Sequence, residues 1–196
     1  ILTDHGFAVT GVDSSSNMLL HARTNAPHAK FILGDVRTFR PNIPYDAVVS
    51  TSNSLSHITK MTELRMTFQN VYQALKENSW FLFDVHMDAG YKAHWQGEFQ
   101  FTDDDMLCSA KSSYAAASHI ASLKISTRTL QHGVWQQTAT VIRQKAYTEE
   151  QLKSGLEAAG FISVAVRDAR RGQAPKGPLQ RALLMGLKPS PNNQSA

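Results

Sequence analysis

The chain of 196 residues lacks several features that would each have indicated a particular class of protein. Its single cysteine, Cys108, excludes an internal disulfide, so a reducing compartment is expected, with the cytoplasm as the default. No apolar run approaches the roughly 20 residues that span a bilayer, and no signal peptide is visible, so no membrane partner is predicted. The chain also contains no Gly-x-Gly motif.

The distribution of charged residues argues against a nucleic-acid-binding protein and against a metal site. The net charge is +4 and the pI about 9.3, but the Lys and Arg residues are scattered and lack the interleaved aromatics typical of nucleic-acid-binding surfaces. The acidic run at residues 103–105 has no His or Cys at ligand spacing beside it. We therefore predict no nucleic-acid partner and no metal site.

Two apolar segments near the start of the chain each lead to a carboxylate. Residues 7–12 are followed by Asp13, and residues 30–33 are followed by Gly34 and Asp35. Serines 14–16 can cap a helix that is predicted over residues 17–23. In an open α/β sheet, an acid at such a strand end meets the ribose hydroxyls of a nucleotide-like ligand, and a second acid one unit later can meet the base.

This segment resembles the cofactor half of class I S-adenosylmethionine-dependent methyltransferases, whose pattern is roughly G-x-D-x-S-x-x-M-L-x-x-A-R and then G-D-x-R. The matching residues are Gly11, Asp13, Ser15, Met18, Leu19, Ala22, Arg23, Gly34, Asp35 and Arg37. The resemblance implies S-adenosylmethionine as the cofactor. It implies cofactor contacts from Asp13, Ser14, Met18, Asp35, Val36, Ser52 and Asn53.

That family has a strand and a Gly-rich loop before its first helix, and no such loop occurs here. Residues 1–6 are typical of the end of a helix that stops at Gly6. We therefore expect a chain that begins within this helix, lacks a central strand and is inactive alone. A native extension of roughly 30 to 50 residues, the size of a β-α unit, is expected to restore cofactor binding.

Alternating strand and helix patterns predict a Rossmann-like α/β fold over residues 1–90. Strands are expected at 30–33, 45–50 and 79–85, with a helix at 62–76. Such alternation indicates a mostly parallel sheet with helices on both faces, and the resemblance implies an antiparallel last strand.

The pattern changes at about residue 91. Residues 91–146 alternate apolar and polar side chains, which predicts a small antiparallel sheet inserted into the fold, and the resemblance implies that it covers the substrate site. Residues 147–188 return to the α/β core, starting with a capping box at residues 148–151, and residues 189–196 form a polar tail that we expect to be disordered.

Catalytic candidates follow the later strands. His86 follows the strand at 79–85 and could act as a base for a nitrogen or oxygen nucleophile. His57 lies in the polar loop at 50–58 and could act as a base or orient the substrate. Methyl transfer from a sulfonium is an in-line displacement that mainly needs alignment and exclusion of water. The predicted activity is therefore methylation of a small-molecule acceptor.

Two other functions remain open at this stage. A non-catalytic protein that binds an adenosine ligand or acts as a scaffold is compatible with the missing Gly-rich loop. A nicotinamide-dependent reductase is disfavoured, because Met18, Leu19, Gly34 and Asp35 belong to the methyltransferase pattern. The methyl acceptor cannot be assigned from these residues, and a homodimer is left open.

Overall fold

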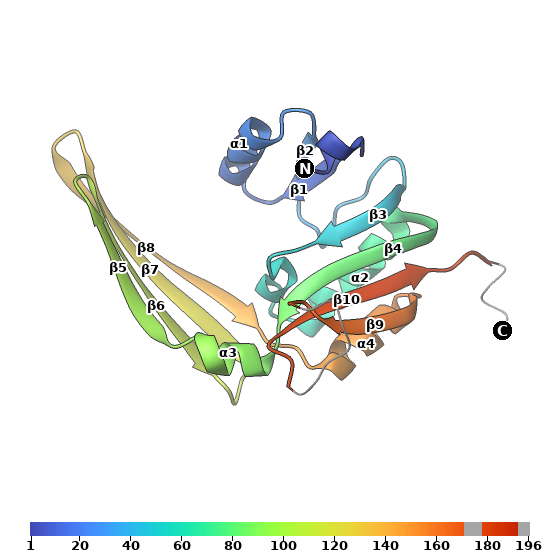
Figure 1. The fold of residues 1–196 in the computed structure, drawn as a ribbon. Coiled ribbons are helices and arrows are strands. Elements are labelled where there is room, and N and C mark those ends of the chain that lie inside the picture. Colours follow the sequence, from blue (N-terminus) through green and yellow to red (C-terminus); the bar gives the residue numbers. More distant parts are fainter. Residues whose placement is uncertain (171–177, 192–196) are drawn as a thin grey trace.

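The computed structural model describes residues 1–170 and 178–191 (Figure 1). Its elements, in chain order, are η1 (Thr3–His5), β1 (Thr10–Asp13), α1 (Ser16–Asn25), β2 (Lys30–Leu33), β3 (Tyr45–Ser50), η2 (Ser54–His57), α2 (Met61–Ala74), β4 (Leu75–His86), α3 (Asp88–His94), β5 (Gly97–Asp103), β6 (Met106–Ala115), β7 (Ile120–Gln131), β8 (Val134–Lys145), α4 (Glu149–Ala158), β9 (Ile162–Asp168) and β10 (Arg181–Lys188). Most of the predicted disordered tail lies outside the described residues. Within them, no helix is long and apolar enough to cross a membrane.

The first sheet is the parallel pair β1–β2. Its register runs from Thr10 opposite Lys30 to Asp13 opposite Leu33, so both strands end at the same edge. Helix α1 begins directly after β1, and the Ser15 hydroxyl accepts the backbone N–H of Met18 at 3.3 Å. The predicted serine cap is confirmed, and it fixes the turn that carries Asp13.

The second sheet has the order β3-β4-β10-β9. β3 runs parallel to β4, whereas β10 is antiparallel to both β4 and β9. The result is a mixed sheet, and with its helices it gives the α/β architecture that the sequence predicts. β1–β2 and this sheet share no ladder of backbone hydrogen bonds among the described residues.

Helices α2 and α4 cover one face of the second sheet and contact each other (Figure 1). Leu64 and Phe68 of α2 and Leu156 of α4 are fully buried against Phe81 and Phe83 of β4. Each such side chain stabilises the fold by about 1.5 to 3 kcal/mol through burial. This layer holds β3 and β4 rigidly, and therefore also the loops that follow them.

The other face of the second sheet differs from the prediction of helices on both faces. Trp80 and Val49 point to that face and are 39% and 56% exposed, and no helix of the described chain covers them. The two amphipathic helices α2 and α4 both pack on the opposite face, which explains the difference.

Strands β5 to β8 form a separate antiparallel sheet, called the arm here, which extends away from the core (Figure 1). Its register is regular from β5 to β8, so alternate residues face the same side along its whole length. The base of the arm packs through Ala121 and Ala146 on Tyr91 of α3, a short helix that the sequence did not predict.

Candidate functional site

Asp13 is the last residue of β1, and Asp35 lies just past the carboxyl end of β2. Asp13 is exposed, and its Oδ1 accepts the backbone N–H of Ser15 at 2.8 Å. No described group bonds its Oδ2, which is free to accept hydrogen bonds from a ligand. Ser14 is exposed beside it, and Met18 is 58% exposed on the first turn of α1. These residues form an accessible rim with one acceptor available.

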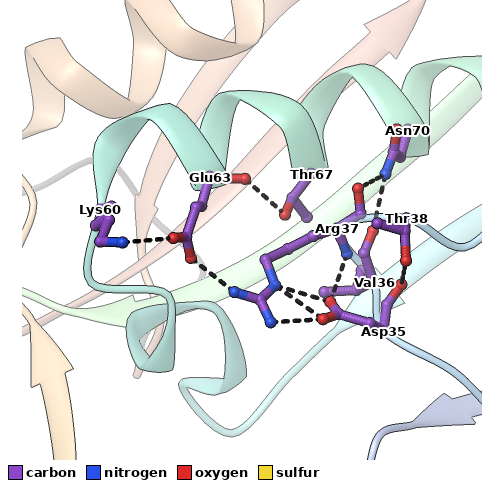
Figure 2. Close-up of polar contacts among 8 residues, drawn as sticks. All are labelled: Asp35, Val36, Arg37, Thr38, Lys60, Glu63, Thr67 and Asn70. Atoms are coloured by element: carbon purple, nitrogen blue, oxygen red, sulfur yellow. Dashed lines mark hydrogen bonds and ion pairs between the residues drawn. The ribbon is translucent and has the colours of Figure 1, made fainter.

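Asp35 is held by its own neighbour, Arg37 (Figure 2). Its carboxylate accepts the backbone N–H of Arg37 at 2.9 Å and the guanidinium Nε and Nη2 at 2.9 and 2.5 Å. These hydrogen bonds hold the pKa of Asp35 below its usual value, so the group is a carboxylate at neutral pH. Arg37 also binds Glu63 of α2 at 2.7 Å, which ties this turn to the second sheet's helix layer.

Val36 is 38% exposed between these two residues, and its carbonyl accepts the side-chain amide of Asn70 at 3.2 Å. The same amide also donates to the carbonyl of Arg37. Asn70 is buried on α2, so the backbone after Asp35 has a fixed position (Figure 2). The Val36 side chain lies outside this anchored backbone and is available to a ligand.

The loop after β3 has an unusual backbone. Ser52 and Asn53 both have a φ of 62°, which lies in the left-handed region that few residues other than glycine adopt. The buried carboxylate of Asp84 holds them there by accepting the N–H of Ser52 at 2.7 Å and of Asn53 at 3.1 Å. Arg181 donates its Nε to the same carboxylate at 2.7 Å and compensates its charge.

The Asn53 side chain is buried and fully hydrogen-bonded. Its Nδ2 donates to Tyr91 Oη and Gln144 Oε1, each at 3.0 Å. Its Oδ1 accepts the Ser56 hydroxyl at 2.6 Å and the His86 backbone N–H at 2.7 Å. This arrangement leaves no free polar atom on the side chain for a cofactor, so Asn53 acts on the site by shaping the loop, whereas Ser52 is exposed.

His57 ends this loop in η2, and its Nε2 lies 3.0 Å from Nε2 of Gln144 on the arm. His57 as a whole is exposed, whereas its partner Gln144 is buried. Burial lowers the pKa of His57 below its usual value. His57 is therefore neutral at neutral pH, and it joins the loop to the arm.

His86 lies at the end of β4 beside the aromatic residues of α3. Its ring centre is 5.5 Å from that of Tyr91 and 6.4 Å from that of Trp95. Burial, and then the positive charge of Arg181, lower the pKa of His86 despite the opposing effect of Asp84. A half-buried neutral imidazole at a strand end can accept a proton from a bound nucleophile.

The structure thus groups the predicted residues into two clusters. Asp13, Ser14, Met18, Asp35 and Val36 surround the ends of β1 and β2. The second cluster, at the ends of β3 and β4, contains Ser52, Asn53, His57 and His86. The second cluster contacts the arm directly, because Gln144 of the arm bonds both Asn53 and His57.

Sequence reasoning missed three residues that organise these clusters. Arg37 matched the family pattern but was given no role, and Asp84 was counted only as part of a strand. Gln144 gave no signal at all, because its partners Asn53 and His57 are about 90 positions away along the chain.

A cavity of about 390 Å³ lies at another place, between the start of α3 and the start of α4. Asp88, His119, Tyr147 and Glu150 are among its lining residues, and neither cluster contributes to it. Across residues 1–170 and 178–191, no group of three or more His, Cys, Asp or Glu side chains is arranged to hold a metal ion.

Comparison with known sequences finds similarity to methyltransferases. A family model described as a methyltransferase domain matches residues 1–78, which contain the first cluster and most of the second. A candidate methyltransferase of Geobacillus sp. (strain WCH70) is 29% identical over 205 residues, an alignment that covers 95% of this chain and 78% of the relative.

Solved structures resemble the whole described fold. An S-adenosylmethionine-dependent methyltransferase from Clostridium acetobutylicum superposes with a TM-score of 0.76 at 18% identity, over 94% of this chain and 76% of that one. The sugar N-methyltransferase KedS8 from Streptoalloteichus sp. superposes with a TM-score of 0.73 at 15% identity, over 92% of this chain and 71% of that one. At these identities the structures show that the chain has the α/β methyltransferase fold.

Proposed function

We propose that the chain is a class I S-adenosylmethionine-dependent methyltransferase that methylates a nitrogen or oxygen atom of a small-molecule acceptor. The observation that carries this proposal is the pair of carboxylates, Asp13 and Asp35, at the ends of adjacent parallel strands. Ligands of open α/β sheets bind at this edge, outside the carboxyl ends of the strands.

The first cluster fits the nucleoside part of the cofactor. Asp13 has a free carboxylate oxygen for the ribose hydroxyls, with Ser14 beside it. Asp35 is fixed by Arg37, and with the exposed Val36 it suits the edge and face of the adenine. The exposed thioether of Met18 can pack on the same ring system. The cofactor supplies an electrophilic methyl group, and the protein supplies its position.

The second cluster fits the reacting end. Ser52 presents its exposed side chain from a loop that Asn53 and Asp84 keep in one conformation. His86 is the proposed proton acceptor for the nucleophile, because its ring is neutral and half-buried at the next strand end. An ammonium group must lose a proton before its nitrogen lone pair can attack the methyl group, a neutral amine releases a proton after the transfer, and a neutral imidazole can accept the proton in either case.

The arm is proposed to cover the acceptor. One face of the arm contacts the core, with Tyr114, Ala121 and Gln144 at its base. Among the described residues, the only charged side chain on this face is Asp103, at the tip of the arm. The opposite face carries the charged residues Glu98, Lys111, Lys124, Arg128, Arg143 and Lys145. A face whose one charge is the acid at its tip favours an acceptor with an apolar or neutral hydroxyl-bearing body over a polyanion.

The activity is tested by following methyl transfer from methyl-labelled S-adenosylmethionine to a panel of small acceptors, with amino sugars, aliphatic amines and phenols as classes. We expect labelled product and S-adenosylhomocysteine with at least one class. Cofactor binding without turnover on any class would instead favour a non-catalytic adenosine-binding protein.

A further inference from the structure

A chain of buried hydrogen bonds connects the end of β4 to the arm. It starts at the backbone N–H of His86, which donates to Asn53 Oδ1 at 2.7 Å. It continues from Asn53 Nδ2 to Gln144 Oε1 at 3.0 Å and ends between Gln144 Nε2 and His57 Nε2 at 3.0 Å. Asn53 and Gln144 in the middle of the chain are buried, whereas His86 is half-buried and His57 is exposed.

The hydrogen bond from the His86 backbone N–H determines the donor and the acceptor in each of the following hydrogen bonds. A backbone N–H can only donate, so the Asn53 atom that faces His86 must be its oxygen, and its NH₂ group must face Gln144. The Gln144 atom that accepts from Asn53 is then its oxygen, and Gln144 turns its own NH₂ group to His57. Tyr91, which donates its hydroxyl to the same Gln144 oxygen at 3.0 Å, supports this orientation.

A Gln NH₂ group has no acceptor, so His57 Nε2 must carry a free lone pair. The neutral ring then bears its proton on Nδ1, the tautomer opposite to the one that free histidine favours. We propose that Gln144 is a positioning residue that holds His57 as the Nδ1–H tautomer and makes it a hydrogen-bond donor to the acceptor molecule. The role toward the acceptor rests on the proposed function, whereas the tautomer does not.

This assignment changes the role predicted for His57. A base at Nε2 would have to accept a proton where the Gln144 NH₂ group already donates, which would bring two donors together. His86 has no such contact on its ring among the described residues and keeps the role of base. The same Gln144 contact fixes the arm to loop 52–57, so the covering sheet and the reacting end share one anchor.

The tautomer is read directly from ¹H–¹⁵N spectra of the full-length protein labelled with ¹⁵N-histidine, at neutral pH. The His57 signals are identified by their loss in His57→Phe. We expect a protonated Nδ1 and an unprotonated Nε2 in the wild type. In Gln144→Glu the carboxylate can only accept, so we expect the proton to move to Nε2. In Gln144→Ala the constraint is removed, and the same shift toward Nε2–H is expected.

Gln136→Glu is the matched control. Gln136 lies on the same strand and the same face of the arm as Gln144 but is exposed, and this substitution adds the same negative charge as Gln144→Glu. It should leave the His57 signals unchanged. An Nε2–H tautomer in the wild type, or signals that are identical in the wild type and in both folded Gln144 variants, would overturn the proposal. Failure to detect methyl transfer would leave the tautomer result standing, so the two claims are tested separately.

Discussion

Arg37 binds the carboxylate of Asp35 with its backbone N–H and its guanidinium at once, at 2.5 to 2.9 Å. A residue two positions along the chain thereby fixes the acid that the cofactor pattern places at the end of β2. Through Glu63, the same guanidinium anchors this turn to α2. The proposed cofactor site is therefore organised before a ligand arrives, which would lower the entropic cost of binding.

Replacing Arg37 with alanine should lower the free energy of unfolding at neutral pH but not in acid. The pKa of Asp35 is lowered from 3.8, mainly by Arg37, so this pair stabilises the fold above about pH 3.8 and the contribution is lost as the pH falls through the folded-state value. Urea unfolding at several pH values should show a difference between wild type and Arg37→Ala at neutral pH that disappears in acid. Lys111→Ala, on the exposed arm, should show no such window.

If the difference in unfolding free energy between the wild type and Arg37→Ala stayed constant from neutral pH into acid, the charge of Asp35 would not be involved in the effect of Arg37.

Replacing His86 with asparagine should slow methyl transfer about 10²- to 10⁴-fold, as expected when a general base is removed. Because burial lowers the pKa of His86 below 6.5, the wild-type rate should fall only when the pH drops below that value. The measurement is kcat against pH, together with the Kd of the cofactor, which should change little. A variant that keeps the acid limb of the pH profile would exclude His86 as the base.

Replacing Asn53 with alanine should destabilise the protein by about 2 to 3 kcal/mol, because the buried His86 N–H and Ser56 hydroxyl lose their acceptor. Alanine also tolerates the left-handed backbone of this position poorly. Asn42→Ala, at an exposed loop position, is the control and should change the unfolding free energy by less than about 0.5 kcal/mol. Equal stability of the two variants would contradict the buried network.

Exchange of residues 97–145 for the matching arm of a relative should change which acceptor is methylated and leave the cofactor Kd nearly unchanged, because the first cluster lies outside the arm. Calorimetry and the acceptor panel measure the two properties on the same protein. Loss of cofactor binding with an unchanged acceptor preference would refute the covering role.

Local elements could be predicted because their signals are local. The strands at 30–33 and 45–50 coincide with β2 and β3, and the capping box of Thr148 and Gln151 forms as expected. Helix α3 was missed because it has seven residues, too few to show an apolar period. Its close packing at Gly90, where a Cβ would collide with the Gln180 carbonyl, comes from a segment distant in sequence.

The candidate site could be predicted only in part for the same reason. The acids at 13 and 35 are visible from the apolar runs before them, whereas the contacts that define Asn53 and His57 come from Gln144 on the arm. Helices were predicted on both faces of the main sheet, because the alternation of strands and helices along the sequence does not specify which face each helix covers. Tertiary packing decides this, and here α2 and α4 share one face.

The most direct test of the account is a calorimetric titration of S-adenosylmethionine into the full-length wild type, Asp13→Ala and Asp104→Ala. Removing the Asp13 carboxylate takes away a charge-assisted acceptor for the ribose, so binding should weaken by about 1 to 3 kcal/mol. Asp104→Ala, which removes an acid from the exposed arm tip, should bind like the wild type. Equal affinity of all three folded proteins, or no binding by any of them, would contradict the assignment of this edge as the cofactor site.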